Sequence, residues 1–440
     1  MVSLAGLLAA ALVATASRAE DSATTTAPAQ TFAVHGQTTF VEQGNAAFTS
    51  PYVGPNSLDP HATAKETWDV TLYAGVRPWS GAEVWINPEV DQGFGLSDTL
   101  GVAGFPSGEA YKVGASNPYL RLQRLFLRQT IDLPGDKQAV GADLNQLSGS
   151  QGANRIVITV GKFGAVDVFD TNSLAHDPRQ DFLNWSVIDA GAYDYAADAW
   201  GYTEGAAVEW YRGPWTARLG LFDLSTVPNG TKLDPHFSQF QADAEIERRY
   251  ALGGRQGSIK LTGFLSHGRM GSFADAVALA EATGQPANTA LVRRFQNRGG
   301  VSVDLQQEIT GALGVFARGG TANGQVEPFA FSDIDQTLSA GLSLKGAAWG
   351  RKDDTVGLAG VVNQISVEHQ AYLAAGGLGI LVGDGQLPRP GAEHILETYY
   401  SLALNPVAHL SGDYQLIANP AYNRDRGPVS VFAVRLHAQF

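Results

Sequence analysis

Residues 161–185, GKFGAVDVFDTNSLAHDPRQDFLNW, hold the densest cluster of chemically capable side chains in the chain. Asp167, Asp170 and Asp177 lie close in sequence to His176 and Arg179. Carboxylate and imidazole groups could chelate a metal ion, but their spacing matches no standard metal site. Arg179 could instead pair with a carboxylate and fix a folded loop, or the cluster could line a channel. The roles of fixing the loop and lining a channel can coexist. We expect no metal and no cofactor.

Motifs of hydrolases and nucleotide-binding enzymes are absent from the chain. The sequence has no G-x-S-x-G elbow, no Walker A motif, no H-E-x-x-H and no G-x-G-x-x-G. The stretch GGLGILVGDG at 376–385 is interpreted as a loop, since its third glycine is misplaced for phosphate binding. We predict no catalytic residue and no enzyme. A hydrolase built from isolated Ser, His and Asn residues is the less favoured alternative.

The elements that position this cluster are indicated by the last ten residues, VFAVRLHAQF. Phe432, Val434, Leu436 and Phe440 share one parity, whereas Arg435 and its neighbours of the other parity are mostly polar. Side chains alternate between the two faces of a strand, so this pattern predicts a strand with one apolar face.

The same alternation recurs along the chain between turns such as PWSG and RGPW. It predicts sixteen strands, near 32–41, 66–77, 82–90, 119–132, 155–164, 200–211, 216–224, 240–250, 258–266, 296–307, 311–319, 336–345, 355–363, 395–404, 407–417 and 429–440. The segment 272–284 is expected to form a short amphipathic helix within a long loop.

Long and short connections tend to alternate between these strands, which would place short turns on one rim and long loops on the other. No apolar run reaches the roughly 20 residues of a membrane-spanning helix. Strands of about 9 to 11 residues in an even number are typical of outer-membrane barrels. The predicted fold is therefore all-β: a transmembrane antiparallel barrel of sixteen strands with short periplasmic turns, long extracellular loops and an aqueous channel.

The polar rows of the strands should face that channel, because a charge facing lipid costs about 2 to 4 kcal/mol near the membrane midplane. Asp69, Glu83, Arg218, Asp243, Glu245, Asp304, Arg318 and Lys345 belong to these rows. The strand at 119–132 changes phase near Gln123, and a bulge would restore its alternation. The same bulge would bring Arg121, Arg124 and Arg128 to the channel side.

The N-terminal segment resembles a secretory signal, with an apolar core from Leu4 to Ala14 and small residues before a cut after about Ala19. We assign 1–19 to a signal peptide, 20–31 to a disordered leader and 32–440 to the barrel. The absence of cysteine from the chain excludes disulfides and Cys-ligated zinc. A net charge of −13 argues against a nucleic-acid partner.

The segment 161–185 resembles the signature of the carbohydrate-selective porins, the OprB family of Gram-negative outer membranes. The steps GKF, D-x-F-D, AHDPR and FLNW occur there in order, and the likeness extends through DAWGYTEGAAVEWY to the closing NPAYNRDRGPVSVFAVRLHAQF. The resemblance implies a channel in the outer membrane through which monosaccharides and related small solutes diffuse. It also implies that His176, Asp177 and Arg179 belong to a loop that narrows this channel.

A sugar-selective constriction needs hydroxyl donors and acceptors together with aromatic faces, all binding weakly enough for release. The candidates are Arg121, Arg124 and Arg128 on the wall with Asp167, Asp170, His176, Asp177 and Arg179 on the loop at 165–199. A non-selective general porin is the main alternative. The expected partners are small sugars and outer-membrane lipid, and both a homotrimer and a monomer remain open.

Overall fold

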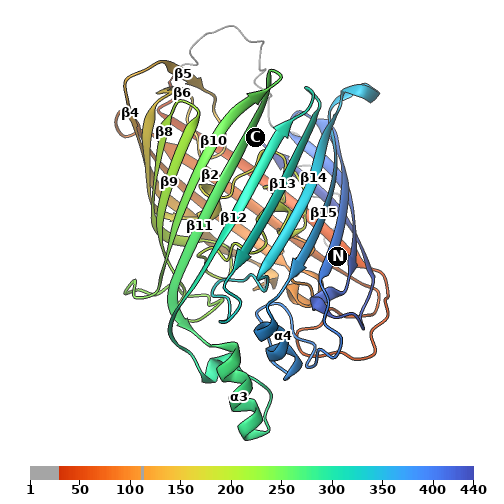
Figure 1. Ribbon diagram of the computed structural model, residues 1–440. Helices are drawn as coiled ribbons and strands as arrows, with labels where there is room; N and C mark the ends of the chain where they lie inside the picture. Colours follow the sequence, from red (N-terminus) through yellow and green to blue (C-terminus); the bar gives the residue numbers. More distant parts are fainter. Residues whose placement is uncertain (1–28, 111–112) are drawn as a thin grey trace.

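The chain forms a closed barrel of sixteen antiparallel strands in the computed structural model, which describes residues 29–110 and 113–440 (Figure 1). The first eight barrel strands are β1 (Phe32–Asn45), β2 (Thr63–Val76), β3 (Ala82–Gly93), β4 (Ala115–Asp132), β7 (Arg155–Phe163), β8 (Thr203–Arg212), β9 (Trp215–Asp223) and β10 (Phe240–Leu252). The second eight are β11 (Arg255–Met270), β12 (Arg294–Glu308), β13 (Leu313–Ala322), β14 (Gln336–Gly346), β15 (Arg351–Gln364), β16 (Glu393–Asn405), β17 (Ala408–Ala418) and β18 (Val429–Gln439). All sixteen predicted strands and the barrel class are confirmed.

The barrel closes where β1 pairs with β18, from Gln37 opposite Gln439 to Asn45 opposite Val431. Gly36 and Phe440 exchange two backbone hydrogen bonds of 3.0 Å each, which extend this seam to the last residue. The rings of Phe432 and Phe440 are 55% and 64% exposed on the outer face. The alternation of the C-terminal segment is therefore that of a closing strand.

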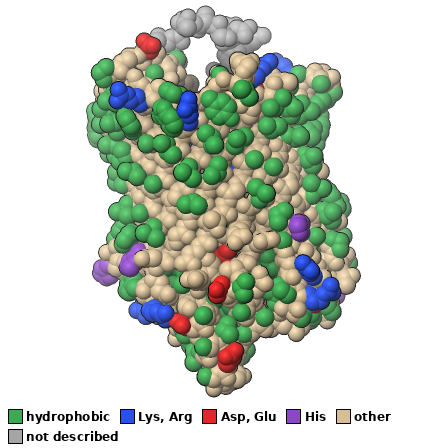
Figure 2. Space-filling model, viewed as in Figure 1, with side chains coloured by type: hydrophobic (Ala, Val, Ile, Leu, Met, Phe, Trp, Pro, Cys, Tyr) green, Lys and Arg blue, Asp and Glu red, His purple; other side chains and the backbone are tan. Residues whose placement is uncertain are grey.

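The outer wall is apolar and the inner wall is polar, as the period-2 patterns predict. On β2, Val70 and Leu72 are exposed while Asp69 and Thr71 are buried. Figure 2 shows one face of the barrel, where hydrophobic side chains cover the wall and charged side chains gather toward its two ends. This distribution matches a wall that faces hydrocarbon between two aqueous rims. No helix in the described part of the chain is long and apolar enough to cross a membrane.

Short turns join the strands at one rim, and longer connections lie at the other. The short turns include 77–81, 213–214, 253–254 and 309–312, whereas 94–114, 164–202, 271–293 and 365–392 are long. The long-loop rim carries α3 (Phe273–Thr283), which confirms the predicted helix, and α4 (Val367–Ala374), which was not predicted. Figure 1 shows both helices at the end of the barrel opposite the hairpin of β5 (Lys137–Val140) and β6 (Gly149–Gly152). That hairpin, also absent from the sequence prediction, sits in the β4–β7 connection at the short-turn rim.

Strand β4 contains the predicted irregularity. Its pairing with β3 shifts between Asn87, opposite Arg124, and Pro88, opposite Leu122, so that Gln123 is the extra residue. Leu120, Leu122 and Leu125 consequently all reach the outer face, where they are 72%, 38% and 44% exposed. Proline has no N–H to donate, which suits it to the position opposite a bulge.

Further 3-10 turns and one short helix occur in the connections between strands. They are η1 (Leu96–Thr99), η2 (Ala165–Asp167), α2 (Trp185–Ile188), η3 (Thr289–Leu291), η4 (Ala347–Trp349) and η5 (Pro420–Tyr422). The predicted signal peptide and residues 20–28 of the predicted leader lie outside the described residues.

Candidate functional site

The connection between β7 and β8, residues 164–202, lies inside the barrel and is called the inner loop below. Its Phe182 is fully buried and packs edge-to-face on Phe316 of β13 and Tyr399 of β16, with ring centroids 5.7 and 5.0 Å apart. Asn184 caps α2 by accepting a hydrogen bond from the amide of Ser186. The inner loop is thus folded and packs against the inner side of β13 and β16.

Strands near the end of the chain hold the inner loop by its backbone. Arg435 of β18 donates hydrogen bonds to the carbonyls of Pro178, Asp181 and Gln180 at 2.5, 2.8 and 3.0 Å. Glu397 of β16 accepts the Leu183 amide at 2.5 Å. These contacts satisfy backbone groups that would otherwise be buried without partners.

Arg179 sits among three carboxylates that come from different elements. Its guanidinium lies 3.2 Å from Glu89 of β3, 3.2 Å from Glu109 of the β3–β4 connection and 3.6 Å from Asp69 of β2. Burial raises the pKa of Glu109, and the positive charge of Arg179 opposes that rise. Arg179 therefore ties the inner loop to two strands and to a second loop at once.

The start of the inner loop is fixed to β4 by Arg124. Its Nε and Nη2 donate to the two carboxylate oxygens of Asp167 at 2.8 and 2.6 Å. Asp167 also accepts the Gly164 amide at 2.8 Å, which closes the turn of η2. Two parallel bonds of this kind define orientation as well as distance.

Asp170 lies deep in the lumen beside Arg318 of β13. Its Oδ2 accepts the Ala190 amide at 2.6 Å, and its Oδ1 lies 3.7 Å from Arg318 Nε. The backbone of Asp170 has a φ of 54°, a left-handed conformation that Asp tolerates better than most residues. Burial raises the pKa of Asp170 to about 7, against the opposing charge of Arg318.

His176 and Asp177 also bind within the inner loop. His176 Nδ1 lies 3.3 Å from Asp189 Oδ1. Burial acts to lower the pKa of His176, but the Asp189 carboxylate outweighs it and the pKa is raised. Burial acts to raise the pKa of Asp177, but the charge and amide of Arg179 hold it below its ordinary value. Both side chains hold the shape of the loop.

A half-buried aromatic and charged face lies where the inner loop returns to β8. The Arg121 guanidinium stacks 3.3 Å above the ring of Trp200 and binds Asp198 at 3.2 Å. Trp200 Nε1 donates to the Tyr119 hydroxyl at 3.1 Å, and Lys162 lies 3.6 Å from Asp198. The set Tyr119, Arg121, Lys162, Asp198 and Trp200 is called the aromatic face below.

Arg128 has a different environment from Arg121 and Arg124. Its Nη2 binds Glu83 of β3 at 2.6 Å and donates to the Asn145 carbonyl at 2.5 Å, in the connection that carries β5 and β6. The three arginines all face the lumen, yet only two contact the inner loop. Arg128 lies nearer the short-turn rim.

Several members of this site were not singled out from the sequence. Trp200 and Asp198 belong to the DAWGY stretch directly before β8, so their nearness to the loop end could have been used. Glu89, Glu109 and Asp69 stand on separate elements, and no local pattern links them to Arg179. Their roles depend on the register of β2 and β3.

The site offers guanidinium and ammonium N–H donors, carboxylate acceptors and aromatic ring surface inside the barrel. Such groups can exchange with the water shell of a neutral polar solute. Within residues 29–110 and 113–440, no three His, Asp or Glu side chains are grouped in a way that could hold a metal ion. The arrangement suits weak and reversible binding.

A family model described as "Carbohydrate-selective porin, OprB family" matches residues 56–440. A search of curated protein sequences found no match. The sequence comparison therefore depends on the family model, which spans most of the barrel.

Solved structures resemble this chain in fold. The high-pH structure of Pseudomonas putida OprB has a TM-score of 0.68 at 17% identity and covers 93% of this chain and 94% of that chain. Its low-pH structure gives 0.50 at 13% identity over 93% of each chain. The outer membrane channel DcaP of Acinetobacter baumannii gives 0.50 at 10% identity, over 93% of this chain and 97% of that chain.

Proposed function

This chain belongs to the OprB family of carbohydrate-selective porins, and we propose that small neutral sugars diffuse passively through its barrel along the aromatic face. The location in the outer membrane follows from the family and from the barrel. By the general rule for such barrels, the short-turn rim faces the periplasm and the long-loop rim faces outward.

The observation that carries the proposal is the stack of Arg121 on Trp200 beside Tyr119 and Asp198. An indole ring offers a surface to the C–H face of a pyranose, while the guanidinium and carboxylate offer donors and acceptors to its hydroxyls. The Arg121 side chain is 22% exposed, so part of it remains accessible to solute. The Trp200 ring stacks on the planar guanidinium and Asp198 accepts a hydrogen bond from its Nη2, and together these contacts set its donor directions.

The charge pattern favours a neutral solute over a free cation. Arg121 and Lys162 share one carboxylate, Asp198, and Arg124 is paired with Asp167. A cation that passes these groups must give up water without gaining a free counter-charge. A sugar exchanges hydroxyl–water bonds for hydroxyl–protein bonds at little net cost, and so binds weakly and leaves quickly.

Liposome swelling tests this proposal. Purified protein should admit glucose faster than an uncharged amino acid of similar size, and Trp200→Ala should reduce that preference while still admitting both. Trp210→Ala, on the outward face of β8 and 43% exposed, is the matched control and should leave the preference unchanged. Equal rates for glucose and amino acid in the unchanged protein would indicate a non-selective porin instead.

A further inference from the structure

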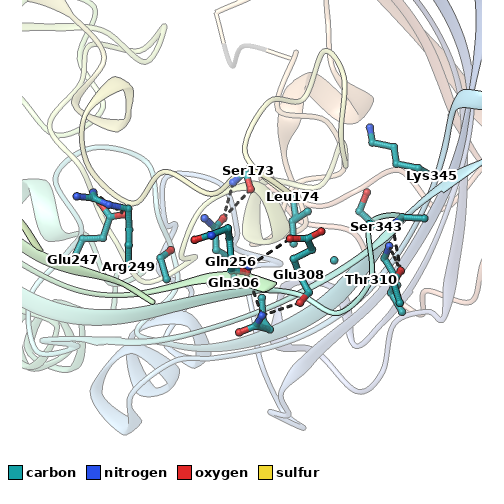
Figure 3. A pocket seen from close by; sticks show the side chains of 17 residues that line it. Ser173, Leu174, Glu247, Arg249, Gln256, Gln306, Glu308, Thr310, Ser343 and Lys345 are labelled. Atoms are coloured by element: carbon teal, nitrogen blue, oxygen red, sulfur yellow. Dashed lines mark hydrogen bonds and ion pairs between the residues drawn. The ribbon is translucent and has the colours of Figure 1, made fainter. Parts of the chain in front are cut away.

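A cavity of about 510 Å³ lies at the short-turn end of the lumen, away from the aromatic face. Figure 3 shows its wall, formed by β10 to β14, with side chains such as Glu247, Arg249, Gln256, Glu308 and Lys345 around the space. Pockets for small molecules usually measure about 300 to 1,000 Å³, so the space is large enough for a sugar of one or two rings.

The tip of the inner loop forms the roof of this cavity. The Ser173 amide and hydroxyl both donate to Gln306 Oε1 of β12, at 2.8 and 3.1 Å. Leu174 packs against Gly314 of β13, where a Cβ atom would come within 2.7 Å of its side chain. The roof is therefore fixed, and glycine at position 314 is what allows Leu174 to lie there.

The lining matches a neutral polyhydroxyl ligand. Glu247 and Glu308 are balanced by Arg249 and Lys345, so the wall carries no net charge. Leu174 adds an apolar patch for a C–H face. Ser258 of β11 also lines the cavity, and its Oγ has no hydrogen-bond partner within the part of the chain that the structure describes. A rotatable hydroxyl is a group that a sugar hydroxyl can satisfy.

An arginine–tyrosine cluster borders the cavity on the side of β7 to β9. Tyr211 of β8 lies under Arg155 at 3.6 Å and near Arg218 and Arg249, each 5.9 Å from the ring centroid. Arg249 is at the same time part of the cavity wall. An arginine contact with an aromatic ring, as between Arg121 and Trp200, thus occurs a second time on the short-turn side of the inner loop.

We propose that this cavity is a second saccharide subsite, which holds a mono- or disaccharide after it has passed the inner loop and before it leaves through the short-turn rim. The subsite rests on the proposed function, since it concerns the same solutes. It differs from the aromatic face in position and in lining, and so each can be removed without the other.

Single-channel recording with maltose added on one side only tests the subsite. Gln256→Trp fills the cavity mouth without removing any described side-chain hydrogen bond, and Arg249→Ala removes a donor from its wall. Arg248→Ala is the matched control, because Arg248 is the adjacent residue on the outward face of β10 and contacts Trp215. The orientation of the inserted channel is determined from the current block by maltose added on the opposite, long-loop side. Trp200→Ala serves as the reference variant for that block.

With maltose on the short-turn side, the half-saturating concentration for current block should rise about threefold or more in Gln256→Trp and Arg249→Ala. It should stay unchanged in Arg248→Ala. Sugar block that is present in the unchanged protein and identical in both cavity variants would overturn the subsite and leave the proposed function standing. No sugar block in the unchanged protein, with equal swelling rates, would overturn both. If Arg249→Ala fails to assemble, the result for Gln256→Trp decides.

Discussion

Arg124 on the barrel wall and Asp167 at the start of the inner loop are joined by two parallel hydrogen bonds, of 2.8 and 2.6 Å. The arginine that the sequence marks as a solute contact is thus engaged in holding the loop. Its ring contact with Tyr202, 4.9 Å from the guanidinium carbon, fixes it further.

Arg124→Ala and Asp167→Ala should each weaken sugar block, because either change frees the start of the inner loop. The double variant should be little worse than either single one, since both act through the same bonds, with a coupling of about 1 to 3 kcal/mol. A double-mutant cycle on the half-saturating glucose concentration measures this. Additive effects would mean that the two residues act independently.

Arg179→Ala should loosen the inner loop more severely than any other single change in it. The variant leaves Asp69, Glu89 and Glu109 close together without their shared cation, and breaking such a buried group costs about 3 to 5 kcal/mol. We expect a larger and noisier conductance together with reduced sugar preference. Gln180→Ala, at the exposed neighbouring position, is the control. Unchanged conductance in Arg179→Ala would contradict the role of Arg179 in holding the inner loop.

Asp181 should make the inner loop sensitive to pH. Burial, with Asp177 nearby, raises the pKa of Asp181 to about 6. A group with a raised folded pKa contributes stability that is full below its ordinary value of 3.8 and is lost as pH rises through about 6. A difference of about two pKa units corresponds to roughly 3 kcal/mol.

Current noise from the loop should therefore fall as pH is lowered from 7 to 5, and Asp181→Asn should be quiet at both values. The raised pKa of Asp170, about 7, adds a second change in current noise over the same pH range. The difference in noise between the unchanged protein and Asp181→Asn therefore isolates the effect of Asp181. The same noise in the two proteins at pH 7 would show that ionised Asp181 does not strain the loop.

The seam between Gly36 and Phe440 should control assembly. A Cβ atom at position 36 would lie 2.7 Å from the Phe440 ring, so Gly36→Leu should displace the ring and lower the yield of inserted barrel. Gly412→Leu is the control, because no atom lies within 4 Å of a Cβ built at that outward-facing glycine. Deletion of residues 431–440 should abolish insertion, since the unpaired strand edge would face lipid. Normal conductance of that truncated chain would contradict the observed register.

The barrel could be predicted from sequence because alternation is a local signal that each strand carries by itself. Even the bulge at Gln123 is readable, since Leu122 and Leu125 cannot share a face without it. The hairpin β5–β6 was not predicted, because its strands are four residues long and lack the apolar row that contact with lipid requires.

The internal contacts of the site could be predicted only in part. Arg179 was expected to find a carboxylate, but three candidates on β2, β3 and a separate loop become neighbours only through the closed sheet. Arg128 looked equivalent to Arg124 by parity, whereas its height in the barrel places it beside Glu83 and Asn145. Whether any of these residues meets a sugar remains a prediction.

Arg435, which binds the carbonyls of Pro178, Gln180 and Asp181, stands on β18, the strand that closes the barrel. Because β18 closes the barrel against β1, the inner loop acquires these three hydrogen bonds only when that strand has joined the sheet. The position of the inner loop therefore depends on a closed seam as well as on the contacts of the loop itself.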